Sequence, residues 1–427
     1  MNGEKYETTA KKLFKIIINR NILKYKNSKL FYWIIKRLLE YGSKCMKLRV
    51  FEAFAGIGAQ ASALKRLNIN YEIVGISEWF VDAILCYDQI QNDGKPEIEL
   101  PTKEEQIDYL KQFTFSKDSV HPINDISKLS EDLISQLYKA NIRTKNYGSI
   151  VDIGNGKIKM PETDLLIYSF PCQDLSTGGL TKGMKKGSGT RSGLLWEIEK
   201  ILLILKKEKS LPKYLLMENV KAILADSNRE DLNQWLNFLS KIGYQNNETM
   251  ILDATKFGIP QDRKRCFIIS RLGKKKLNIK PSDLETNEKW NCLDFIKQDY
   301  TQIDLKNEAD AAQLYPTKSR LDMWRINKRE PIKENTIIHT ITCNMDRSNT
   351  AAMLKYEGAK GDSFRLLTMR EAFLLMGFTE QEYLRAKKLG LSYRKLNKLI
   401  GNSIVVNVLV EIFRYLFSKD YEVKPND

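Results

Sequence analysis

The feature that most restricts the possible folds is an apolar strand that runs into a glycine turn and then a helix. The strand begins at Leu48, Gly56 and Gly58 form the turn, and the helix is expected to continue to about Arg66. In this Gly-x-Gly-x-x-Ala pattern the glycines let the backbone approach a ligand, and the helix N-terminus supplies N–H groups. The segment is typical of a doubly wound α/β domain that binds a ligand at its first turn.

A carboxylate and an indole follow at the next strand end. Glu78 closes the predicted strand 71–76, and Trp79 is beside it. A carboxylate there accepts hydrogen bonds from the two hydroxyls of a ribose, and an indole offers a flat face to adenine. NAD and S-adenosylmethionine both contain adenosine, so these residues alone leave both open. A tight turn without a ligand is the structural alternative.

Strands and helices alternate up to Arg271, which predicts a sheet covered by helices. Further apolar strands are expected at 164–168, 212–220, 248–253 and 266–271, and helices at 193–206 and 230–242. Ser192 is expected to cap the first of these helices.

Two Asp-Ile pairs are candidates for a strand end near an adenine amino group. Asp125-Ile126 is preferred because the helical segment 126–140 follows it. Asp152-Ile153 runs into Asn155-Gly156, which is a hairpin signal. The residues at about 92–120 and 141–162 carry few strand signals, so we interpret them as segments inserted into the domain.

Cys172 lies on a turn after the predicted strand 164–168. Pro171 stops that strand because proline has no N–H for a ladder. Open α/β sheets bind ligands outside the carboxyl ends of their strands, so a thiol held there is well placed to act as a nucleophile. A cysteine that serves only as a small apolar residue is the alternative. Glu218 closes the strand 212–220, and a carboxylate there is either bonded to a neighbour or held for chemistry.

Composition indicates an anionic partner. The net charge of +16 and a pI of about 9.3 favour nucleic acid over a neutral metabolite. The glycine-rich segment 177–191 adds lysines and an arginine, and we expect it to form a mobile loop over a polyanionic substrate. A plain surface loop is the alternative. Arg263 and Arg265 point to one side if their segment is extended.

Cysteine and histidine usage argues against a disulfide framework and a metal site. The six cysteines lie far apart without a Cys-x-x-Cys pair, and the chain has only two histidines. A reducing cytoplasm fits best. No apolar run approaches the length that spans a bilayer, and we expect neither a signal peptide nor a membrane anchor.

The chain divides into four predicted segments. Residues 1–46 predict a basic, aromatic helical extension, which is expected to pack on the main domain rather than follow DNA phosphates. Residues 47–271 form the predicted catalytic and cofactor-binding domain. Residues 272–364 are polar, lysine-rich and weakly periodic, which favours a smaller, irregular domain, and residues 365–427 complete the first one.

Taken in order, the motifs resemble those of the cytosine-C5 DNA methyltransferases, from about Arg49 to Leu416. The resemblance rests on Phe54-Ala55-Gly56-Ile57-Gly58, Glu78-Trp79, Asp125-Ile126, Pro171-Cys172-Gln173, Glu218-Asn219-Val220, Gln261-Asp262-Arg263-Lys264-Arg265, Arg365-Leu366-Leu367-Thr368-Met369-Arg370-Glu371 and Gly401-Asn402-Ser403. Asn124 and Ala59 stand where the family pattern has glycine. The implied fold is α/β, a Rossmann-like S-adenosylmethionine-dependent methyltransferase domain with a smaller, irregular target-recognition domain.

The resemblance also implies a mechanism. The Cys172 thiolate adds to C6 of cytosine, Glu218 holds and protonates N3, and Arg263, with Arg265, braces the base. C5 then takes the methyl group of S-adenosylmethionine, and a base removes the C5 proton so that the thiol leaves. The cytosine must be flipped out because C6 is buried in a duplex. No metal is required.

Further residue roles come from the same resemblance. Cofactor contacts are expected at Phe54, Gly56, Gly58, Glu78, Trp79, Asp125, Ile126, Pro171, Leu195, Asn402 and Ser403, with S-adenosylhomocysteine as the product. DNA contacts are expected at Gln173, Ser176, Lys182, Lys185, Lys186, Arg191, Gln261, Thr340 and Thr342. The implied partners are double-stranded DNA and a restriction endonuclease acting on the same site, with the chain a monomer in a prokaryotic cytoplasm or nucleoid.

Three other functions stay open at this point. A tRNA methyltransferase of the same family is disfavoured by the long recognition segment. A regulator that only binds nucleic acid has no need of Cys172, Glu218 and Arg263 together. An NAD-dependent dehydrogenase would share the adenosine-binding features.

Overall fold

The computed structural model describes residues 47–172, 175, 183–286, 288–315, 317–319, 322, 332–345 and 352–421. The predicted helical extension, residues 1–46, lies outside the described residues. Three of the predicted DNA-contacting residues, Gln173, Ser176 and Lys182, lie outside them as well.

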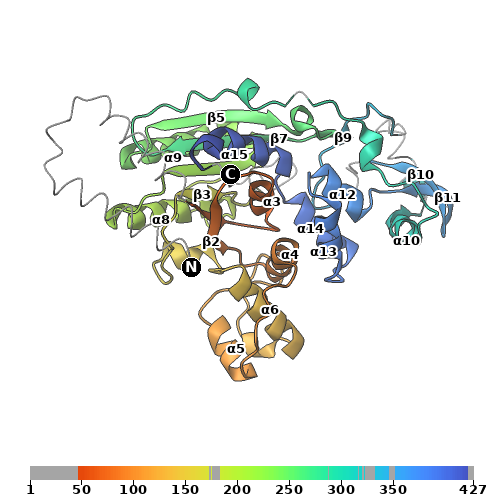
Figure 1. The fold of residues 1–427 in the computed structure, drawn as a ribbon, viewed down its shortest axis with the longest axis horizontal. Coiled ribbons are helices and arrows are strands. Elements are labelled where there is room, and N and C mark those ends of the chain that lie inside the picture. Colours follow the sequence, from red (N-terminus) through yellow and green to blue (C-terminus); the bar gives the residue numbers. More distant parts are fainter. Residues whose placement is uncertain are drawn as a thin grey trace, which may run out of the picture.

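A six-stranded sheet forms the centre of the molecule (Figure 1). Its order is β2-β1-β3-β4-β7-β5, with β1 Leu48–Ala53, β2 Tyr71–Ser77, β3 Leu165–Tyr168, β4 Tyr214–Val220, β5 Asn246–Asp253 and β7 Lys264–Arg271. The α/β prediction is confirmed, and each strand coincides with a predicted apolar run. The first four strands are parallel, whereas β7 runs antiparallel to both β4 and β5, which the sequence pattern did not indicate.

Helices cover both faces of the sheet and complete two apolar cores. One core contains α3 Ala59–Lys65, α4 Val81–Asn92 and α15 Val406–Tyr421, and the other contains α7 Ile150–Gly154, α8 Leu195–Lys207 and α9 Arg229–Ile242. Successive strand residues supply opposite cores, as Val50 and Phe51 do, because strand side chains alternate between faces. The last described helix, α15, packs against α3, so it completes a core to which β1, the first described strand, contributes.

Residues between α4 and β3 add a smaller third core. It is formed by α5 Lys103–Leu110, the short 3-10 helix η2 Ile126–Lys128 and α6 Glu131–Arg143, which project from the sheet at the bottom of Figure 1. A capping box at Thr102 and Glu105 begins α5, and the Ser130 hydroxyl caps α6. Short 3-10 helices follow β4 and β5, namely η4 Lys221–Leu224, η5 Asp226–Asn228 and η6 Ala254–Phe257.

Two local predictions in the first domain are wrong. The segment at Asp152 is helical rather than a hairpin, because Ser149 Oγ accepts a hydrogen bond from Val151 N at 3.3 Å and starts α7. Ser192 does not cap α8: it lies in η3 Ser192–Leu194, and its hydroxyl donates to Pro171 O at 2.8 Å. In both places a serine bond that the periodicity does not reveal decides the local structure.

The segment after β7 contains short elements that its weak periodicity did not predict. They are η7 Pro281–Asp283, η8 Cys292–Phe295, α10 Ile303–Ala312, β8 Gln313–Leu314, β9 Ile338–His339, β10 Leu354–Gly358 and β11 Gly361–Arg365. A small antiparallel sheet has the order β10-β11-β8, and β9 pairs with β6 Gln261–Asp262, just before β7. The chain then returns to the large domain through α12 Met369–Leu375, α13 Glu380–Lys387 and α14 Tyr393–Gly401.

The stretch Tyr393–Tyr421 is long and apolar enough to cross a membrane by length and composition, so the expectation that no stretch reaches that length is wrong. In the structure it forms two helices, α14 and α15, separated at residues 402–405. The most apolar window of the stretch is 61% buried inside the protein, and residues such as Ile412 and Phe413 are fully buried. Packing against the sheet accounts for this apolar composition.

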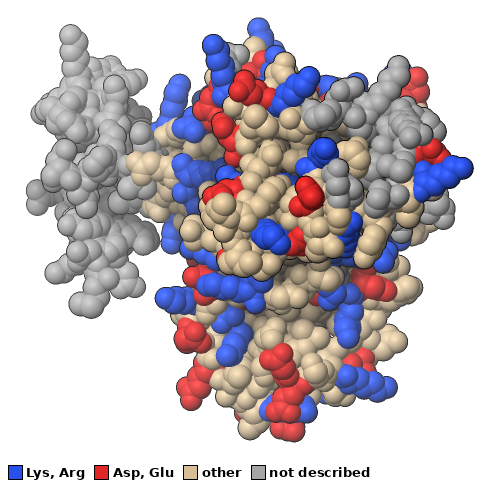
Figure 2. All heavy atoms as spheres, turned by 90° about the vertical axis from the view of Figure 1, so that its right-hand side faces the viewer, with Lys and Arg blue, Asp and Glu red and all other residues tan. Residues whose placement is uncertain are grey.

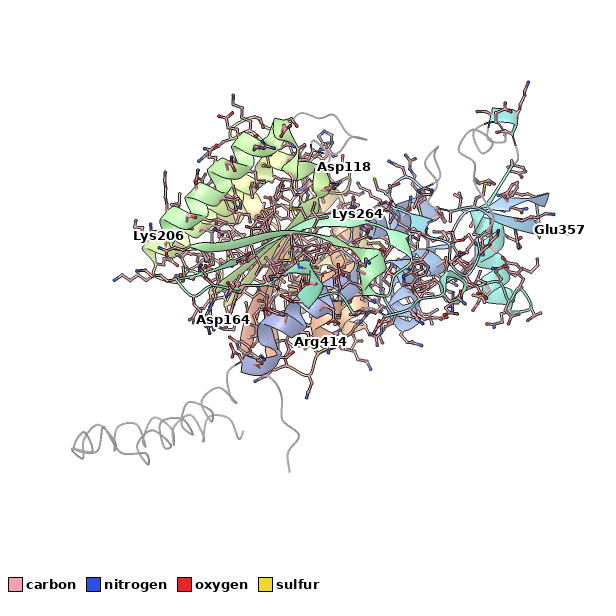
Figure 3. The ribbon with its side chains drawn as sticks, turned by 90° about the horizontal axis from the view of Figure 1, so that it is seen from above. Asp118, Asp164, Lys206, Lys264, Glu357 and Arg414 are labelled. Carbon is pink, nitrogen blue, oxygen red and sulfur yellow. The ribbon has the colours of Figure 1, made fainter. Side chains whose placement is uncertain are left out.

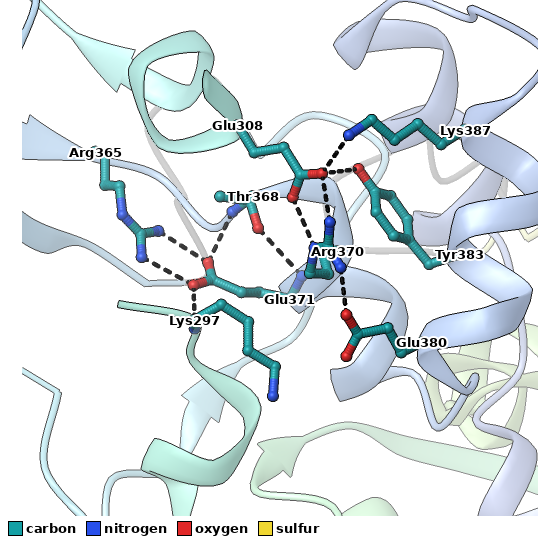
Figure 4. A network of polar contacts seen from close by, with 9 residues as sticks. All are labelled: Lys297, Glu308, Arg365, Thr368, Arg370, Glu371, Glu380, Tyr383 and Lys387. Atoms are coloured by element: carbon teal, nitrogen blue, oxygen red, sulfur yellow. Dashed lines mark hydrogen bonds and ion pairs between the residues drawn. The ribbon is translucent and has the colours of Figure 1, made fainter. Parts of the chain in front are cut away.

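A buried ion pair joins β11 to α12 (Figure 4). The Arg365 guanidinium donates to both oxygens of Glu371 at 2.8 Å, and both side chains are fully buried. The same carboxylate accepts hydrogen bonds from Lys297 N and Thr368 N, each at 2.8 Å. Every oxygen of the pair is therefore satisfied, which a buried charge requires.

Glu308 ties α10 to the returning helices in the same way. It accepts hydrogen bonds from Arg370 at 3.0 Å, from the Tyr383 hydroxyl at 2.9 Å and from Lys387 Nζ at 2.8 Å. Arg370 also pairs with Glu380 (Figure 4). These contacts hold the small sheet and its helix against α12 and α13.

Glu371→Ala is expected to lower the free energy of unfolding by about 3–5 kcal/mol, because it leaves the Arg365 charge buried without its partner. Urea denaturation followed by circular dichroism measures the change. Glu411→Ala is the matched control, since it removes a surface pair with Arg414 and should cost less than about 1 kcal/mol. Equal losses in the two variants would contradict the assignment.

Glu52, on β1, is another buried ionisable residue, and it differs from Glu371 in having no ion-pair partner in the described part of the chain. It is fully buried, and neither carboxyl oxygen makes a hydrogen bond within the described residues. Burial raises the pKa of Glu52 to about 8, and Tyr87 and Lys65 oppose the rise. The carboxyl is therefore protonated at neutral pH, which avoids an isolated buried charge.

Glu52→Gln is expected to raise the free energy of unfolding above about pH 5. Between the ordinary glutamate pKa of 4.5 and about 8, the unfolded chain has released the Glu52 proton and the folded chain has not, so the native stability falls as pH rises. The variant does not titrate there, and its advantage should grow up to about pH 8. Denaturation at pH 5, 7 and 8 measures it, and a constant difference would contradict the prediction.

Candidate active site

One cavity of about 270 Å³ lies where the parallel strands end, and it contains both the thiol and the adenosine-type features. The strand register pairs Ala53 with Ser77 and with Tyr168, and Tyr168 with Met217. The next residue on each strand therefore sits at the same level: Phe54, Glu78, Ser169 and Glu218 all line the cavity. Cys172 lines it too, so the predicted nucleophile, the predicted acid and the first glycine turn face one space.

The turn that carries Cys172 is held by its neighbours. Asn219 Nδ2 donates to Phe170 O at 3.0 Å, and the Ser192 hydroxyl donates to Pro171 O. Leu175 N donates to Cys172 O at 3.0 Å. Since backbone carbonyls on both sides of the proline are bonded, the half-buried thiol is fixed at the edge of the sheet.

Glu218 lies two residues before the end of β4, is 5% exposed, and has partners on both oxygens. The Ser169 hydroxyl donates to one oxygen, and Arg265 Nε lies 3.5 Å from the other. Arg265 reaches the carboxylate because antiparallel β7 starts beside the end of β4, where Val220 pairs with Arg265. The antiparallel strand that the sequence did not predict is thus what brings this arginine to the acid.

Opposing charges act on the thiol. Burial raises the pKa of Cys172, and the Glu218 carboxylate raises it further, whereas Arg265 and Arg263 oppose both effects. The resting cysteine is therefore a protonated thiol. A further cation beside these two arginines, or the loss of the Glu218 charge, would favour the thiolate.

The other end of the cavity suits an adenosine. The Glu78 carboxylate accepts hydrogen bonds from Gly56 N at 2.9 Å and Phe80 N at 2.8 Å, and burial raises its pKa against these bonds. Two N–H groups leave further acceptor sites on the carboxylate. Trp79 and Phe54 line the same end with aromatic surface. Carboxylate acceptors beside aromatic walls fit a ribose and a purine.

Comparison with known proteins identifies the family. The profile of the C-5 cytosine-specific DNA methylases matches residues 124–418. The chain belongs to this family. It is therefore an enzyme, a DNA cytosine-5 methyltransferase. This excludes the two alternatives of a regulator that only binds nucleic acid and of an NAD-dependent dehydrogenase.

Two curated relatives span almost the whole methylase. The orphan methyltransferase M.SssI of Spiroplasma monobiae is 38% identical over 384 residues, which is 87% of this chain and 97% of that one. The type II methyltransferase M2.ScrFI of Lactococcus lactis subsp. cremoris is 36% identical over 386 residues, 87% and 99% of the two chains. The crystal structure of the Dnmt2 methyltransferase of S. pombe matches with a TM-score of 0.53 at 19% identity. The match covers 87% of this chain and 99% of that one, so the two proteins share the fold.

The cavity of the methylase contains most of the predicted cofactor residues. Its wall includes Phe54, Gly56, Glu78, Trp79, Pro171, Asn402 and Ser403. Leu195 is fully buried in a core, and its neighbour Leu194 lines the cavity instead, so that prediction is wrong by one residue. Gly58 is also outside the wall. Its φ of +82° and the Tyr87 ring, 2.8 Å from where a Cβ would lie, explain the glycine.

Asp125 and Ile126 are not in the wall, so their predicted role is wrong. Asp125 accepts hydrogen bonds from Ser127 and caps η2, while Ile126 is buried in the third core. The wall is completed instead by Gly148, Ser149 and Ile150, at the start of α7. Sequence reasoning missed this segment because it searched for an acid before the isoleucine, and a serine stands there.

Asn146 shows why the chain approaches the cavity at this place. Its side-chain oxygen accepts hydrogen bonds from Glu78 N at 3.0 Å and Gly148 N at 3.1 Å, and its side-chain nitrogen donates to Glu78 O at 2.9 Å. The isolated bridge between Ile76 and Asn146 runs parallel. The segment therefore extends the edge of the sheet beside β2.

Two residues of the Gln-x-Arg-x-Arg motif make hydrogen bonds within the protein that the sequence did not predict. Arg263 is 3% exposed and donates to three backbone carbonyls, those of Ile341, Gly401 and Ser403. It lines the cavity, but its guanidinium is directed at the backbone, which corrects the expectation that it braces the base. Gln261 is fully buried and bonds Leu375 O and Ile341 N, so it is not a DNA contact.

The other predicted DNA-contacting residues are placed differently. Arg191 lines the cavity, and Lys185 is exposed. Lys186 pairs with Glu199 and lies over the Trp196 ring, so its charge is already engaged. The Thr340 hydroxyl donates to Asp262 O, and Thr342 Oγ1 accepts from Asn344 N at 3.4 Å. Lysines, arginines and carboxylates are interspersed on the face of the described residues seen in Figure 2.

Alkylation of Cys172 by iodoacetamide should rise with pH, with a midpoint above that of a free thiol, since only the thiolate reacts and the pKa is raised. Glu218→Gln is expected to lower this midpoint, and Arg265→Gln is expected to raise it. Peptide mass spectrometry gives the rate for Cys172, with half-exposed Cys343 as the internal control. A midpoint that neither substitution moves would contradict the electrostatic account.

Proposed function

We propose that this methylase transfers a methyl group to C5 of a cytosine flipped out of a specific duplex DNA site, through a covalent bond between Cys172 Sγ and C6. The observation that carries the proposal is the shared cavity of Cys172, Glu218 and Glu78. A thiol, a carboxyl and an adenosine-type pocket in one space are what this transfer requires.

Cys172 and Glu218 divide the activation of the ring. C5 of cytosine is a weak nucleophile, so attack of the thiolate at C6 is needed to move electron density to C5. Glu218 would bond N3 and the exocyclic amino group as negative charge develops on the ring. Ser169 and Arg265, which contact the carboxylate, orient it toward the base. After C5 has accepted the methyl group, a base such as water would take the C5 proton, and the bond between C6 and Cys172 Sγ would break, which restores the ring and releases the thiolate.

Arg265 is the cation best placed for the developing charge. Its Nε faces Glu218, and its charge acts on Cys172. Arg263 would act indirectly, by fixing the segments that carry Ile341 and Ser403 around the base. We propose this division because every described bond of the Arg263 guanidinium goes to a backbone carbonyl.

The residues at the end of the cavity that contains Glu78 fit S-adenosylmethionine. Glu78 would hold the ribose hydroxyls, and Trp79, Phe54 and Ile150 would enclose the adenine. Asn402 and Ser403 would contact the rest of the molecule. The bound cofactor supplies the methyl group that C5 accepts.

For the biological role, we propose modification of host DNA in a restriction–modification system of a prokaryotic cell, with an endonuclease acting on the same site and the methylase active as a monomer in the cytoplasm or nucleoid. The name type II methyltransferase of one relative supports this, whereas the name orphan methyltransferase of another favours a methylase alone. Lys185 and Arg191 would contact phosphates near the flipped base.

The decisive experiment incubates duplex DNA with the protein and labelled S-adenosylmethionine, followed by bisulfite sequencing. Cys172→Ala is expected to lower methylation by at least about 10³-fold, because the covalent route is lost. Cys343→Ala, at the other described cysteine that is not buried, is the control and should keep activity. Methylation that survives Cys172→Ala would overturn the mechanism, and transfer to tRNA rather than duplex DNA would overturn the substrate.

A further inference from the structure

A short loop closes one edge of the cofactor end of the cavity. Residues 116–121 are fixed at their start to the segment after Glu78, because Ser116 N donates to Trp79 O at 2.7 Å and Val81 N donates to Ser116 O at 2.9 Å. Ser119 then lines the cavity. The loop is exposed on its other side at Asp118 and Val120, so it forms a thin boundary between the cavity and solvent.

The loop has its own internal structure. The Asp118 carboxylate accepts hydrogen bonds from Val120 N at 2.7 Å and His121 N at 2.8 Å, and its second oxygen lies 2.7 Å from His121 Nδ1. These bonds lower the pKa of Asp118. Because the turn is self-contained, residues 116–121 can move as a unit about the anchor at Ser116.

Lys398 joins this loop to α14. It lies on α14, lines the cavity, and donates from Nζ to Asp118 O at 2.7 Å and Ser119 Oγ at 2.8 Å. The same ammonium is 4.5 Å from the centroid of the Phe80 ring. One half-buried side chain therefore bridges two segments that are about 280 residues apart in the sequence.

The hydrogen bonds that Lys398 makes to the loop can break without separating an ion pair. Both hydrogen-bond acceptors are neutral, and the described ion pairs include none with Lys398. Lys395, one turn earlier on the same helix, is exposed and pairs with the Asp82 carboxylate at 3.1 Å. Two lysines of one helix thus make different contacts, and only Lys398 holds a segment of the cavity wall.

We propose that residues 116–121 are a strap over the cofactor end of the cavity, and that Lys398 is the latch that keeps it closed. This inference rests on the proposed cofactor site. Lys398 is a positioning residue: it controls how fast S-adenosylmethionine enters and S-adenosylhomocysteine leaves. The helix that carries it runs directly into Asn402 and Ser403, so a shift of α14 moves latch and cavity wall together.

Stopped-flow binding of S-adenosylhomocysteine to the full chain tests the latch. Lys398→Met is expected to raise the dissociation rate about tenfold, by removing charge-assisted hydrogen bonds, and to raise the association rate as well. The equilibrium affinity should then change less than either rate, because a gate acts on both directions. Lys395→Met is the matched control and should leave both rates unchanged.

A double variant and a second ligand distinguish a latch from other roles of Lys398. Ser119→Ala should raise both rates by a smaller factor, and combining it with Lys398→Met should add little, because both variants break the same bridge. 5′-Methylthioadenosine, which lacks the amino-acid carboxylate, should show the same acceleration as S-adenosylhomocysteine in Lys398→Met.

Three results would overturn the latch. The first is unchanged rates in Lys398→Met with intact binding. The second is faster dissociation with an unchanged or slower association, which would mean direct contact with the ligand or local unfolding. The third is an effect confined to S-adenosylhomocysteine, which would assign Lys398 to its carboxylate. Absence of any binding by the unaltered chain would overturn the proposed function and this inference together.

Discussion

The active-site cavity depends on the parallel register of β1, β2, β3 and β4. Hydrogen bonding between parallel strands brings their carboxyl ends to one level, so the residues that follow them meet at one edge of the sheet. Phe54, Glu78, Ser169 and Glu218 occupy that level, although they are scattered over more than 160 residues of sequence. A one-residue slip of any strand would turn its side chains to the wrong face and remove one wall of the cavity.

The polar groups of the cavity are fixed before any substrate binds. Glu78 is bonded to backbone N–H groups of two loops, Glu218 to a serine and an arginine, and Arg263 to three carbonyls. Figure 3 shows how densely side chains fill the space around the sheet, with Lys264 marking the start of β7. Groups oriented in advance do not have to reorganise when charge develops on a ring, which is the usual source of electrostatic rate enhancement.

The sequence predicted what depends on local pattern. The strands follow from apolar runs, the end of the strand before Cys172 follows from a proline, and the carboxyl near the end of β4 follows from an acid in an apolar run. The antiparallel direction of β7 could not be predicted, because an apolar run is the same in both directions. The roles of Gln261 and Arg263 were also hidden, since their partners Leu375, Gly401 and Ser403 lie more than 100 residues away.

The errors at Asp125 and Leu195 have a similar origin. A short Asp-Ile pair was assigned by analogy with a motif, while the segment that actually lines the cavity, at Ser149, is positioned by the side chain of Asn146. At Leu195 the join between η3 and α8 decides, since Leu194 at the end of η3 lines the cavity and Leu195 at the start of α8 is buried in the core. Which of two adjacent leucines faces the cavity is decided only when the protein folds.

The three carbonyls bonded by Arg263 have a consequence for biosynthesis. They belong to Ile341, to Gly401 at the end of α14 and to Ser403 in the loop before α15, and α15 itself packs on α3. A polypeptide still being translated holds Cys172 and Glu218 but lacks the groups that enclose them. A chain that stops before α14 would leave Arg263 without two of its three carbonyl partners, and it would expose the apolar surface that α15 covers in the complete core.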